Sequence, residues 1–316
     1  MLENNIDVSI IFVNYKTAKL VEDVIESIAL KSSGFSYEII IVDNSNDEEE
    51  WEKISKLENS YIKIIDAKSN LGFGKANNLG STIAKGKYLF FLNTDTLLLN
   101  NAIYELKIFL DVHSDVGIVG SNLFTADNKP NHSYILKVKD LKNEHMNLSF
   151  FQGVISKLKR KRDDFNYTDK PLEIYGYVCG AALMIRKDAF EYLNGFDKDI
   201  FMYAEEALLC YQLIQKLNLK IFNIPSSKII HFEGGSQNDF PSKKKIEMRI
   251  NGNYIYFLKA FGEKKAMRFL KINYIASSKM KFFYSVFYNK EKKNYYGNLK
   301  NQYKNKLLNI KKCKSV

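Results

Sequence analysis

Residues 87–99 read Lys87-Tyr88-Leu89-Phe90-Phe91-Leu92-Asn93-Thr94-Asp95-Thr96-Leu97-Leu98-Leu99. The apolar run Tyr88–Leu92, which has no glycine or proline, predicts a β-strand buried on both faces. Parallel α/β sheets place ligands beyond the carboxyl ends of their strands, so Asp95 is expected at the rim of a binding site. Its carboxylate suits a divalent cation that holds a diphosphate. On this stretch alone, an ordinary polar turn explains Asn93-Thr94-Asp95 equally well.

Two earlier apolar runs also end in polar residues. Val8–Val13 is followed by Asn14-Tyr15-Lys16-Thr17, and Glu38–Val42 is followed by Asp43-Asn44-Ser45. Between them, apolar residues recur at helical spacing and predict an amphipathic helix that ends near Gly34. Two strands joined by a helix form a right-handed βαβ unit with a parallel sheet. Their polar ends are therefore expected along one edge of the sheet.

A glycine-containing segment precedes the central strand and reads Asn70-Leu71-Gly72-Phe73-Gly74-Lys75-Ala76-Asn77-Asn78. Gly72-Phe73-Gly74 resembles the start of a dinucleotide-binding fingerprint, but no third glycine stands at the required spacing and the strand before it is weak. We therefore set a dinucleotide cofactor aside. The glycines are instead expected to let the backbone approach a nucleotide, with a helix over Ala76–Ala84 behind them.

The chain after Asp95 first continues this alternation and then becomes irregular. Ile103–Val112 predicts a helix and Val116–Gly120 a strand. Residues 124–172 sustain no period and contain His132, His145 and a basic cluster at 157–162. A long irregular insertion of this kind is usually a functional cover or a mobile segment, and we expect a flap over the binding site.

Regular structure then returns. Tyr175–Ile185 predicts a strand with small residues in its middle, where a ligand or another backbone can approach closely. Glu205 and Glu206 begin an apolar helix, a position at which carboxylates stay ionised. They are candidates for chemistry, although the preference for acidic residues in a first helical turn also explains them.

Two short strands are expected at Lys220–Pro225 and Lys228–Phe232. The second contains His231, which stands shortly before the turn Gly234-Gly235-Ser236. A single histidine at such a place is more often structural than a ligand.

The composition is that of a globular protein with one large or two smaller domains, with 316 residues, 46% of them hydrophobic and 26% charged. Asp7 interrupts the first residues, so they do not resemble a signal peptide, and no apolar span of about 18 residues predicts a transmembrane helix. Cys179, Cys210 and Cys313 lack the spacing and even count of a disulfide framework or a zinc ribbon. We expect a reducing, cytosolic setting.

The net charge of +11 is unevenly distributed. Residues 241–316 hold 20 lysines and arginines against three glutamates, a charge of +17, so residues 1–240 carry −6. Apolar residues from Ile246 to Phe261 recur at intervals of three and four residues, and this spacing predicts an amphipathic helix. Basic faces backed by aromatic residues are typical of helices on an anionic membrane surface.

Nucleic acid is a second candidate partner for the basic segment, because its phosphates attract the same charges. The acidic body would repel such a polymer, however, and no RNA-binding motif occurs in the chain. Packing of these helices on the body, or pairing of two copies as a homodimer, stays open.

Taken in order, these segments resemble the motifs of the inverting glycosyltransferases of family 2, most closely the rhamnosyltransferase branch, over residues 8–236. The matching motifs are Val13-Asn14-Tyr15, Val42-Asp43-Asn44-Ser45, Asn70-Leu71-Gly72-Phe73 with Asn77-Asn78, Phe91-Leu92-Asn93-Thr94-Asp95, and Phe201-Met202-Tyr203 with Glu205-Glu206. The resemblance implies the α/β GT-A nucleotide-sugar-binding fold, a Rossmann-like, mostly parallel sheet flanked by helices. Residues 1–240 would form this catalytic domain, with 124–172 on the acceptor side, and residues 241–316 a C-terminal helical extension.

The resemblance also implies a role for each matched residue. The donor nucleotide would be bound by Asn14, Thr17, Asp43, Asn44, Gly72, Phe73, Asn77, Asn93 and Thr94. Asp43 would hydrogen-bond the pyrimidine, and Asn77 would lie near the ribose or phosphates. Asp95 would bind Mg²⁺ or Mn²⁺, with His231 as the second protein ligand. Glu206 stands at the position of the catalytic base, with Glu205 beside it.

The chain departs from the family pattern at two places. Leu208 and Gln212 replace an acidic residue and an arginine, which at i,i+4 would form an ion pair on the helix surface. Because both charged members of this pair are absent, neither leaves an unpaired charge on the helix. Glu206 replaces the commoner aspartate, and the extra methylene moves the carboxylate by about 1.5 Å.

The sequence therefore predicts a metal-dependent, inverting glycosyltransferase that moves rhamnose or another hexose from a dTDP- or UDP-sugar. The acceptor would be a saccharide or a lipid-linked saccharide in surface polysaccharide synthesis, and the enzyme would be cytoplasmic and peripheral on the inner face of the plasma membrane. A catalytically inactive sugar-nucleotide-binding scaffold is the first alternative. A basic-tailed nucleic-acid-binding protein is the second.

Overall fold

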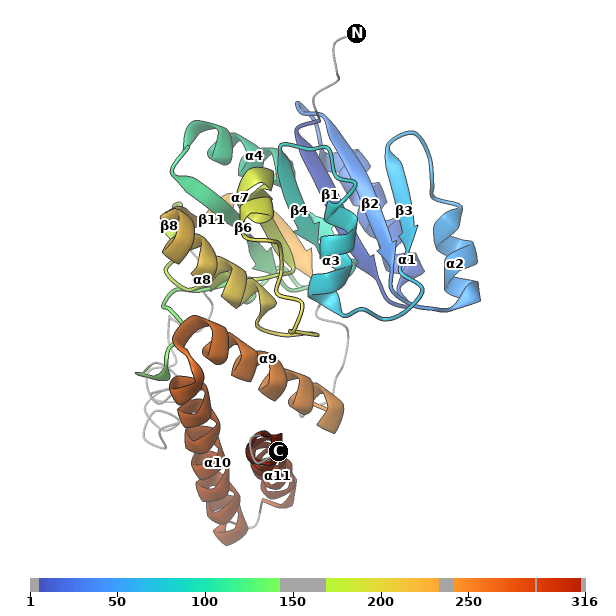
Figure 1. Cartoon of the computed structure of the whole chain (residues 1–316). Helices are drawn as coiled ribbons and strands as arrows, with labels where there is room; N and C mark the ends of the chain where they lie inside the picture. Colours follow the sequence, from blue (N-terminus) through green and yellow to red (C-terminus); the bar gives the residue numbers. More distant parts are fainter. Residues whose placement is uncertain (1–5, 143–168, 233–240, 288, 314–316) are drawn as a thin grey trace. The chain divides into compact units, whose positions relative to one another are not determined.

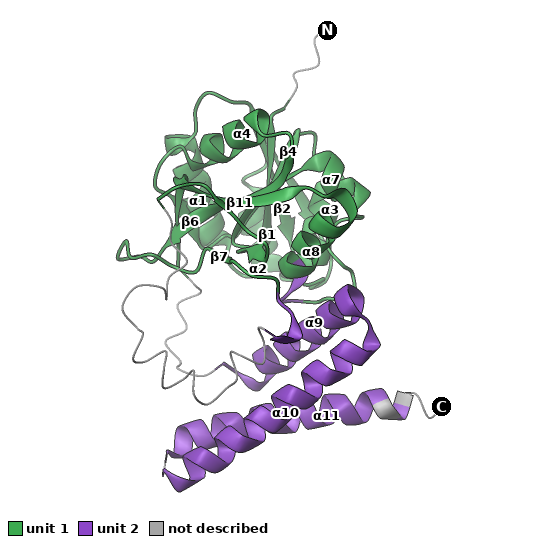
Figure 2. Ribbon diagram, turned by 90° about the vertical axis from the view of Figure 1, so that its left-hand side faces the viewer, with its two compact units in different colours: residues 1–138, 163–201, 206–236 green, residues 139–162, 202–205, 237–316 purple. Residues whose placement is uncertain are grey.

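The computed structural model describes residues 6–142, 169–232, 241–287 and 289–313 (Figure 1). The chain forms two compact units, which Figure 2 distinguishes by colour. The first comprises residues 1–138, 163–201 and 206–236, and the second comprises residues 139–162, 202–205 and 237–316. We call them the sheet unit and the helical unit.

The sheet unit is built on a mixed, mostly parallel sheet in the order β3-β2-β1-β4-β10-β6-β11-β5, with β8 paired to β11. Strands β3, β2, β1 and β4 run parallel to one another, and β6 runs parallel to β11. Strand β10 is antiparallel to both β4 and β6, and β11 is antiparallel to β5 and β8. The strands of this sheet are β1 (Val8–Asn14), β2 (Tyr37–Asp43), β3 (Ile62–Asp66), β4 (Tyr88–Leu92), β5 (Thr96–Leu98), β6 (Val116–Phe124), β8 (Leu172–Glu173), β10 (Ala182–Arg186) and β11 (Lys220–His231).

Helices cover both faces of the sheet, which explains why the central strand β4 is apolar at every position. Along β1, Ile10 and Phe12 pack in a core with α1 and α4, whereas Ile11 packs in a second core with α7 and α8. The helices of the sheet unit are α1 (Ala18–Lys31), α2 (Glu48–Ser55), α3 (Phe73–Ser81), α4 (Ala102–Val112), α7 (Lys187–Tyr192) and α8 (Glu205–Leu217, whose first residue is grouped with the helical unit).

The strand register brings the predicted polar strand ends to one edge. β1 and β2 are parallel, and their last paired residues are Asn14 and Asp43. β4 runs parallel to β1 on its other side, with Phe91 opposite Ile11. The predicted βαβ unit is confirmed, and the residues that follow β1, β2 and β4 meet at the carboxyl edge.

Several predicted boundaries were wrong. Tyr175–Ile185 is not one strand, because the chain turns at Gly180 between β9 (Tyr177–Val178) and β10. The two short strands expected on either side of Pro225 are one strand, β11, with a register shift between Ile224 and Lys228 that accommodates the proline. Helix α3 begins at Phe73, before the predicted Ala76.

The insertion at 124–172 is described only at its ends. There, β7 (Tyr134–Ile135) pairs antiparallel with β9. His145 and the basic cluster at 157–162 lie outside the described residues, so a flap over the acceptor side stays a prediction.

The helical unit contains α9 (Lys243–Phe261), α10 (Glu263–Val286) and α11 (Lys290–Cys313). The predicted amphipathic helix is α9, and its residues Ile246, Ile250 and Phe257 are buried. Phe257 stacks on Phe269 of α10 with ring centroids 4.6 Å apart, and Phe269 meets Tyr303 of α11 edge-on at 6.2 Å. Within the described ranges, none of the helices combines the length and apolar character needed to cross a bilayer.

Candidate active site

The ends of β1, β2 and β4 are joined by side-chain hydrogen bonds. Asn14 Nδ2 donates to Asp43 Oδ1 at 2.9 Å, which links β1 to β2. Thr17 Oγ1 donates to Asn14 Oδ1 at 2.9 Å and lies 3.1 Å from Thr94 Oγ1, which follows β4. Asn14 and Asp43 are buried. Four of the predicted nucleotide-binding residues therefore form one connected network at the carboxyl edge.

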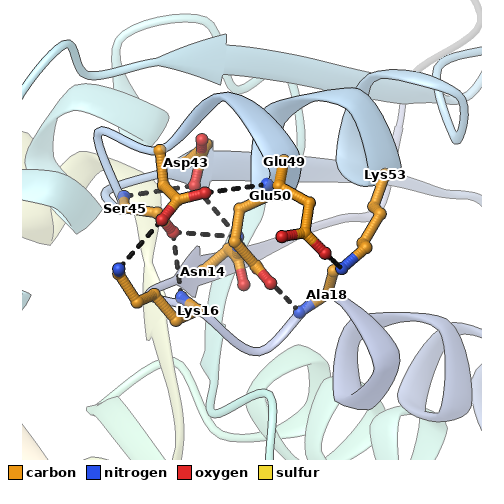
Figure 3. Close-up of polar contacts among 9 residues, drawn as sticks. Asn14, Lys16, Ala18, Asp43, Ser45, Glu49, Glu50 and Lys53 are labelled. Atoms are coloured by element: carbon orange, nitrogen blue, oxygen red, sulfur yellow. Dashed lines mark hydrogen bonds and ion pairs between the residues drawn. The ribbon is translucent and has the colours of Figure 1, made fainter.

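Glu50 of α2 supports this network from outside the predicted motifs (Figure 3). Its Oε2 accepts from the backbone N–H of Ala18 at 3.1 Å and from Asn14 Nδ2 at 3.3 Å. Ala18 is the first residue of α1, where backbone N–H groups lack helical partners and attract negative charge. Thr17 provides no side-chain cap for α1, so Glu50 takes over that task from another helix.

The glycine segment is held by amide side chains. Asn44 Oδ1 accepts from Leu71 N at 2.8 Å, and Asn44 Nδ2 donates to Asn70 Oδ1 at 3.1 Å. Gly72 has a φ of +79°, and a Cβ built there would lie 2.2 Å from the Phe201 carbonyl oxygen. A side chain at this position would therefore clash with the protein's own backbone, and contact of Gly72 with a nucleotide stays a prediction.

Asp95 and His231 meet at the same edge although they are far apart in the sequence. His231 Nε2 lies 3.3 Å from Asp95 Oδ1 and 3.5 Å from Asn93 Nδ2. Their side chains keep small exposed fractions, 18% for Asp95 and 13% for His231. The cause is the antiparallel pairing of β11 with β5, which puts His231 opposite Thr96, the residue after Asp95.

Glu206 lies against the turn that precedes β10. A Cβ built at Gly180 would be 3.8 Å from Glu206 Cγ, so the glutamate packs on this turn. The next residue, Ala181, accepts a hydrogen bond from Asn93 N at 3.0 Å. Burial raises the pKa of the Cys210 thiol, and the Glu206 charge one turn away adds to the rise. The packing of Glu206 on Gly180 and the hydrogen bond between Ala181 and Asn93 thus connect the Glu206 side chain to the carboxyl edge of the sheet.

Three predicted positions have surroundings that the sequence did not indicate. Asn77 is buried and its side chain donates to the Phe73 carbonyl of its own helix at 3.1 Å. Glu205 is buried, whereas Glu206 is partly exposed. Leu208 is buried as well, so the expectation that position 208 lies on the helix surface was wrong. An apolar side chain suits this position because an unpaired charge would be costly there.

Two side chains at the edge have the chemistry of divalent metal ligands. A carboxylate oxygen is the ligand that Mg²⁺ and Mn²⁺ prefer, and an imidazole nitrogen is a common second donor. The Asp95 and His231 atoms face one another at 3.3 Å, close enough to share one cation. Among the described residues no group of three or more His, Cys, Asp or Glu could hold a metal, so this pair offers two protein ligands.

The supporting roles of three residues were not predicted from the sequence: Glu50, Asn70, and Ser45, whose Oγ accepts from Lys16 N at 2.9 Å. A partial signal for Glu50 existed. Asp47 is the N-cap of α2 and accepts from Glu50 N, the arrangement with which a capping box begins. That pattern predicts where α2 starts, but not that the glutamate reaches a different helix.

The chain is similar in sequence to known glycosyltransferases. The family model described as glycosyl transferase family 2 matches residues 9–193. Rhamnosyltransferase WbbL of Escherichia coli K12 is 26% identical over 181 residues, covering 54% of this chain and 65% of the relative. The Escherichia coli UDP-Glc:alpha-D-GlcNAc-diphosphoundecaprenol beta-1,3-glucosyltransferase WfaP is 29% identical over 175 residues, covering 52% and 66%. The matches thus span just under two thirds of these relatives.

Among solved structures, the chain resembles the crystal structure of GalNAc-T7 with UDP, GalNAc and Mn²⁺. The TM-score is 0.58 at 16% identity, covering 88% of this chain and 51% of that chain. This likeness concerns the fold, and it confirms the predicted GT-A fold. The family model matches more than half of the residues of this chain, and the chain therefore belongs to glycosyl transferase family 2.

Proposed function

We propose that this chain is a metal-dependent, inverting glycosyltransferase that moves rhamnose or another hexose from a dTDP- or UDP-sugar to a saccharide or lipid-linked acceptor. The main support is one juxtaposition. The Asp95–His231 pair and Asn93 lie at the carboxyl end of β4, and Asn93 bonds to the turn on which Glu206 packs. The candidate metal ligands and the candidate base on α8 are thus connected through the carboxyl end of β4.

The residues have complementary tasks in the proposed reaction. The acceptor hydroxyl oxygen forms a bond to the anomeric carbon, and the bond from that carbon to the β-phosphate oxygen breaks. The hydroxyl proton goes to Glu206, and the nucleoside diphosphate leaves on the opposite face, so one displacement inverts the anomeric centre. Asp95 and His231 would hold Mg²⁺ or Mn²⁺, which when bound stabilises negative charge on a diphosphate.

The network around Asn14 and Asp43 would orient the donor base. Asp43 Oδ1 already accepts from Asn14 Nδ2 and from Ser45 N, which fixes the plane of its carboxylate. A carboxylate held in this way can accept from the N–H of a uracil or thymine ring with little further loss of conformational entropy.

The acceptor and setting are proposed from the relatives. One Escherichia coli relative is named as a rhamnosyltransferase and the other as acting on a diphosphoundecaprenol-linked sugar. A lipid-linked acceptor in surface polysaccharide synthesis would place the enzyme at the inner face of the plasma membrane. The basic, aromatic-rich helical unit is consistent with a peripheral attachment.

Binding and turnover are tested separately. UDP or dTDP with Mn²⁺ is expected to raise the melting temperature, because a ligand that binds the native state stabilises it, whereas NAD is expected to have no effect. Asp95→Ala should remove the Mn²⁺-dependent part of this stabilisation. Asp115→Ala, which removes an exposed carboxylate of the same unit, should leave it unchanged.

Transfer is then measured with UDP- and dTDP-sugars. Glu206→Gln should keep nucleotide binding and lose turnover. Nucleotide binding without turnover by the unaltered chain, across the donor and acceptor panel, would support the inactive scaffold instead. No stabilisation by either nucleotide would overturn the proposal.

A further inference from the structure

The end of the hairpin formed by α10 and α11 exposes large apolar side chains. Phe282, Val286 and Phe287 have exposed fractions of 72%, 54% and 64%. Contact between water and such a cluster of apolar side chains is unfavourable, and an exposed apolar cluster usually indicates an interaction site. We call these three residues the hairpin end.

The hairpin end is exposed although the helices beside it are well fixed. Tyr284 of α10 stacks on Tyr296 of α11 with centroids 5.5 Å apart and planes 9° apart. Lys292 lies 5.2 Å from the centre of the Tyr284 ring. A Cβ built at Gly297 would lie 3.6 Å from Lys281 Cε, so the two helices approach closely here. The interhelical contacts are thus made by other residues, and the apolar end is left outside them.

Positive charge surrounds the hairpin end. Residues 279–293 contain five lysines and one glutamate, a net charge of +4. Lys279, Lys290 and Lys293 are exposed. Exposed apolar side chains with exposed lysines nearby in the sequence suit an anionic membrane surface, in which the acyl region lies beneath charged headgroups.

We propose that the hairpin end inserts into the interface of an anionic lipid bilayer and that Lys279, Lys290 and Lys293 contact the headgroups. This inference rests on the membrane association in the proposed function and names the segment responsible. A second copy of the chain is a poorer partner, because pairing two hairpin ends would bring +4 against +4. The bilayer satisfies both the apolar and the basic component.

Vesicle sedimentation of the full chain tests the proposal. Vesicles of phosphatidylcholine mixed with phosphatidylglycerol should bind the protein, and vesicles of phosphatidylcholine alone should bind it more weakly. Phe282→Ser with Phe287→Ser should lower partitioning by at least about tenfold, since each removes a phenyl ring from the lipid. Lys290→Gln and Lys293→Gln should each lower it by about fivefold and weaken its salt dependence.

Leu308→Ser is the matched control, because Leu308 is also exposed on α11 but lies roughly 27 Å along the helix from its start. It should bind vesicles as the unaltered chain does. Circular dichroism should show equal helix content in all variants, since every substituted side chain is exposed.

Insertion depth gives a second readout that a purely electrostatic contact would not change. The chain has one tryptophan, Trp51, in the sheet unit. In Trp51→Phe with Phe282→Trp, anionic vesicles should shift the emission to the blue, and brominated acyl chains should quench it. Emission unchanged by vesicles would overturn the inference.

The outcomes separate this inference from the proposed function. If the unaltered chain does not sediment with anionic vesicles, the membrane association fails as a whole. If it does and the phenylalanine variants sediment equally, the hairpin end is not the inserting segment. Vesicle-independent self-association that the phenylalanine variants abolish would assign this surface to a homodimer instead and overturn the inference. Stabilisation by UDP or dTDP should be the same in all variants.

Discussion

Replacing Glu50 by alanine tests whether an unpredicted residue organises the nucleotide-binding edge. Glu50 Oε2 accepts from Ala18 N at 3.1 Å and from Asn14 Nδ2 at 3.3 Å. Hydrogen bonds to charged groups contribute about 1.5–3 kcal/mol, and these two are long, so we expect a loss of about 2 kcal/mol at the start of α1. At 1.4 kcal/mol per factor of ten, this corresponds to roughly 30-fold faster amide exchange at Ala18.

The assay is hydrogen exchange of the peptide that contains residues 14–21, followed by calorimetric titration with UDP and dTDP. Nucleotide affinity should fall with the exchange protection, because Asn14 loses a partner that orients it toward Asp43. Glu49→Ala is the matched control, since Glu49 is the adjacent glutamate and its exposed carboxylate pairs with Lys53 of the same helix. Glu50→Gln should be intermediate, because an amide oxygen still accepts. Exchange in Glu50→Ala at the unaltered rate, or equal acceleration in Glu49→Ala, would refute the reasoning.

Three further predictions depend on single contacts. Gly72→Ala should lower the urea midpoint more than Gly262→Ala. The two glycines share nearly the same φ and ψ, so an alanine costs about 1–3 kcal/mol of backbone strain at either position, but only at Gly72 would its Cβ also meet the Phe201 carbonyl. Equal losses in the two variants would contradict the steric argument. Burial opposes ionisation of Asp111, but Lys107 and Lys87 together with Tyr88 hold the pKa of its carboxyl well below the usual range. The stability that ionised Asp111 contributes is therefore complete above the unfolded pKa of about 4 and is lost at lower pH. Asp111→Asn should therefore flatten the fall of the urea midpoint from about pH 5 to 3, and an unchanged slope would contradict this. His231→Ala should weaken the Mn²⁺-dependent stabilisation by UDP, because the nitrogen 3.3 Å from Asp95 Oδ1 is lost, whereas the exposed His132→Ala should leave it intact in a thermal shift assay.

The parallel half of the sheet could be predicted because its information is local. β1, β2 and β4 each contain an uninterrupted apolar run, and the helix between β1 and β2 fixes their direction. β5 could not be predicted, since three residues form a strand only when β11 pairs with them. For the same reason the chain passes Pro225 without leaving β11, as β6 continues to pair on both sides of the shift.

The candidate site was predictable in its residue types and not in its supports. Family motifs indicated Asp43, Asp95 and Glu206, and the structure brings the first two to the carboxyl edge and packs the third on the turn at Gly180. Their roles stay predictions. The approach of Phe201 to Gly72 depends on the path of a distant loop, which no local pattern encodes.

The position of β10 has a consequence for how the chain is synthesised. β4 and β6 do not pair with each other, because β10 lies between them and pairs with both. A nascent chain that has emerged only as far as residue 181 would expose unpaired β4 and β6 edges, which are templates for aggregation. We expect a chain truncated after residue 181 to aggregate in a translation extract, and one extended through β11, which pairs with the other edge of β6, to remain dispersed. The growing polypeptide would thus stay vulnerable until the ribosome has delivered both β10 and β11.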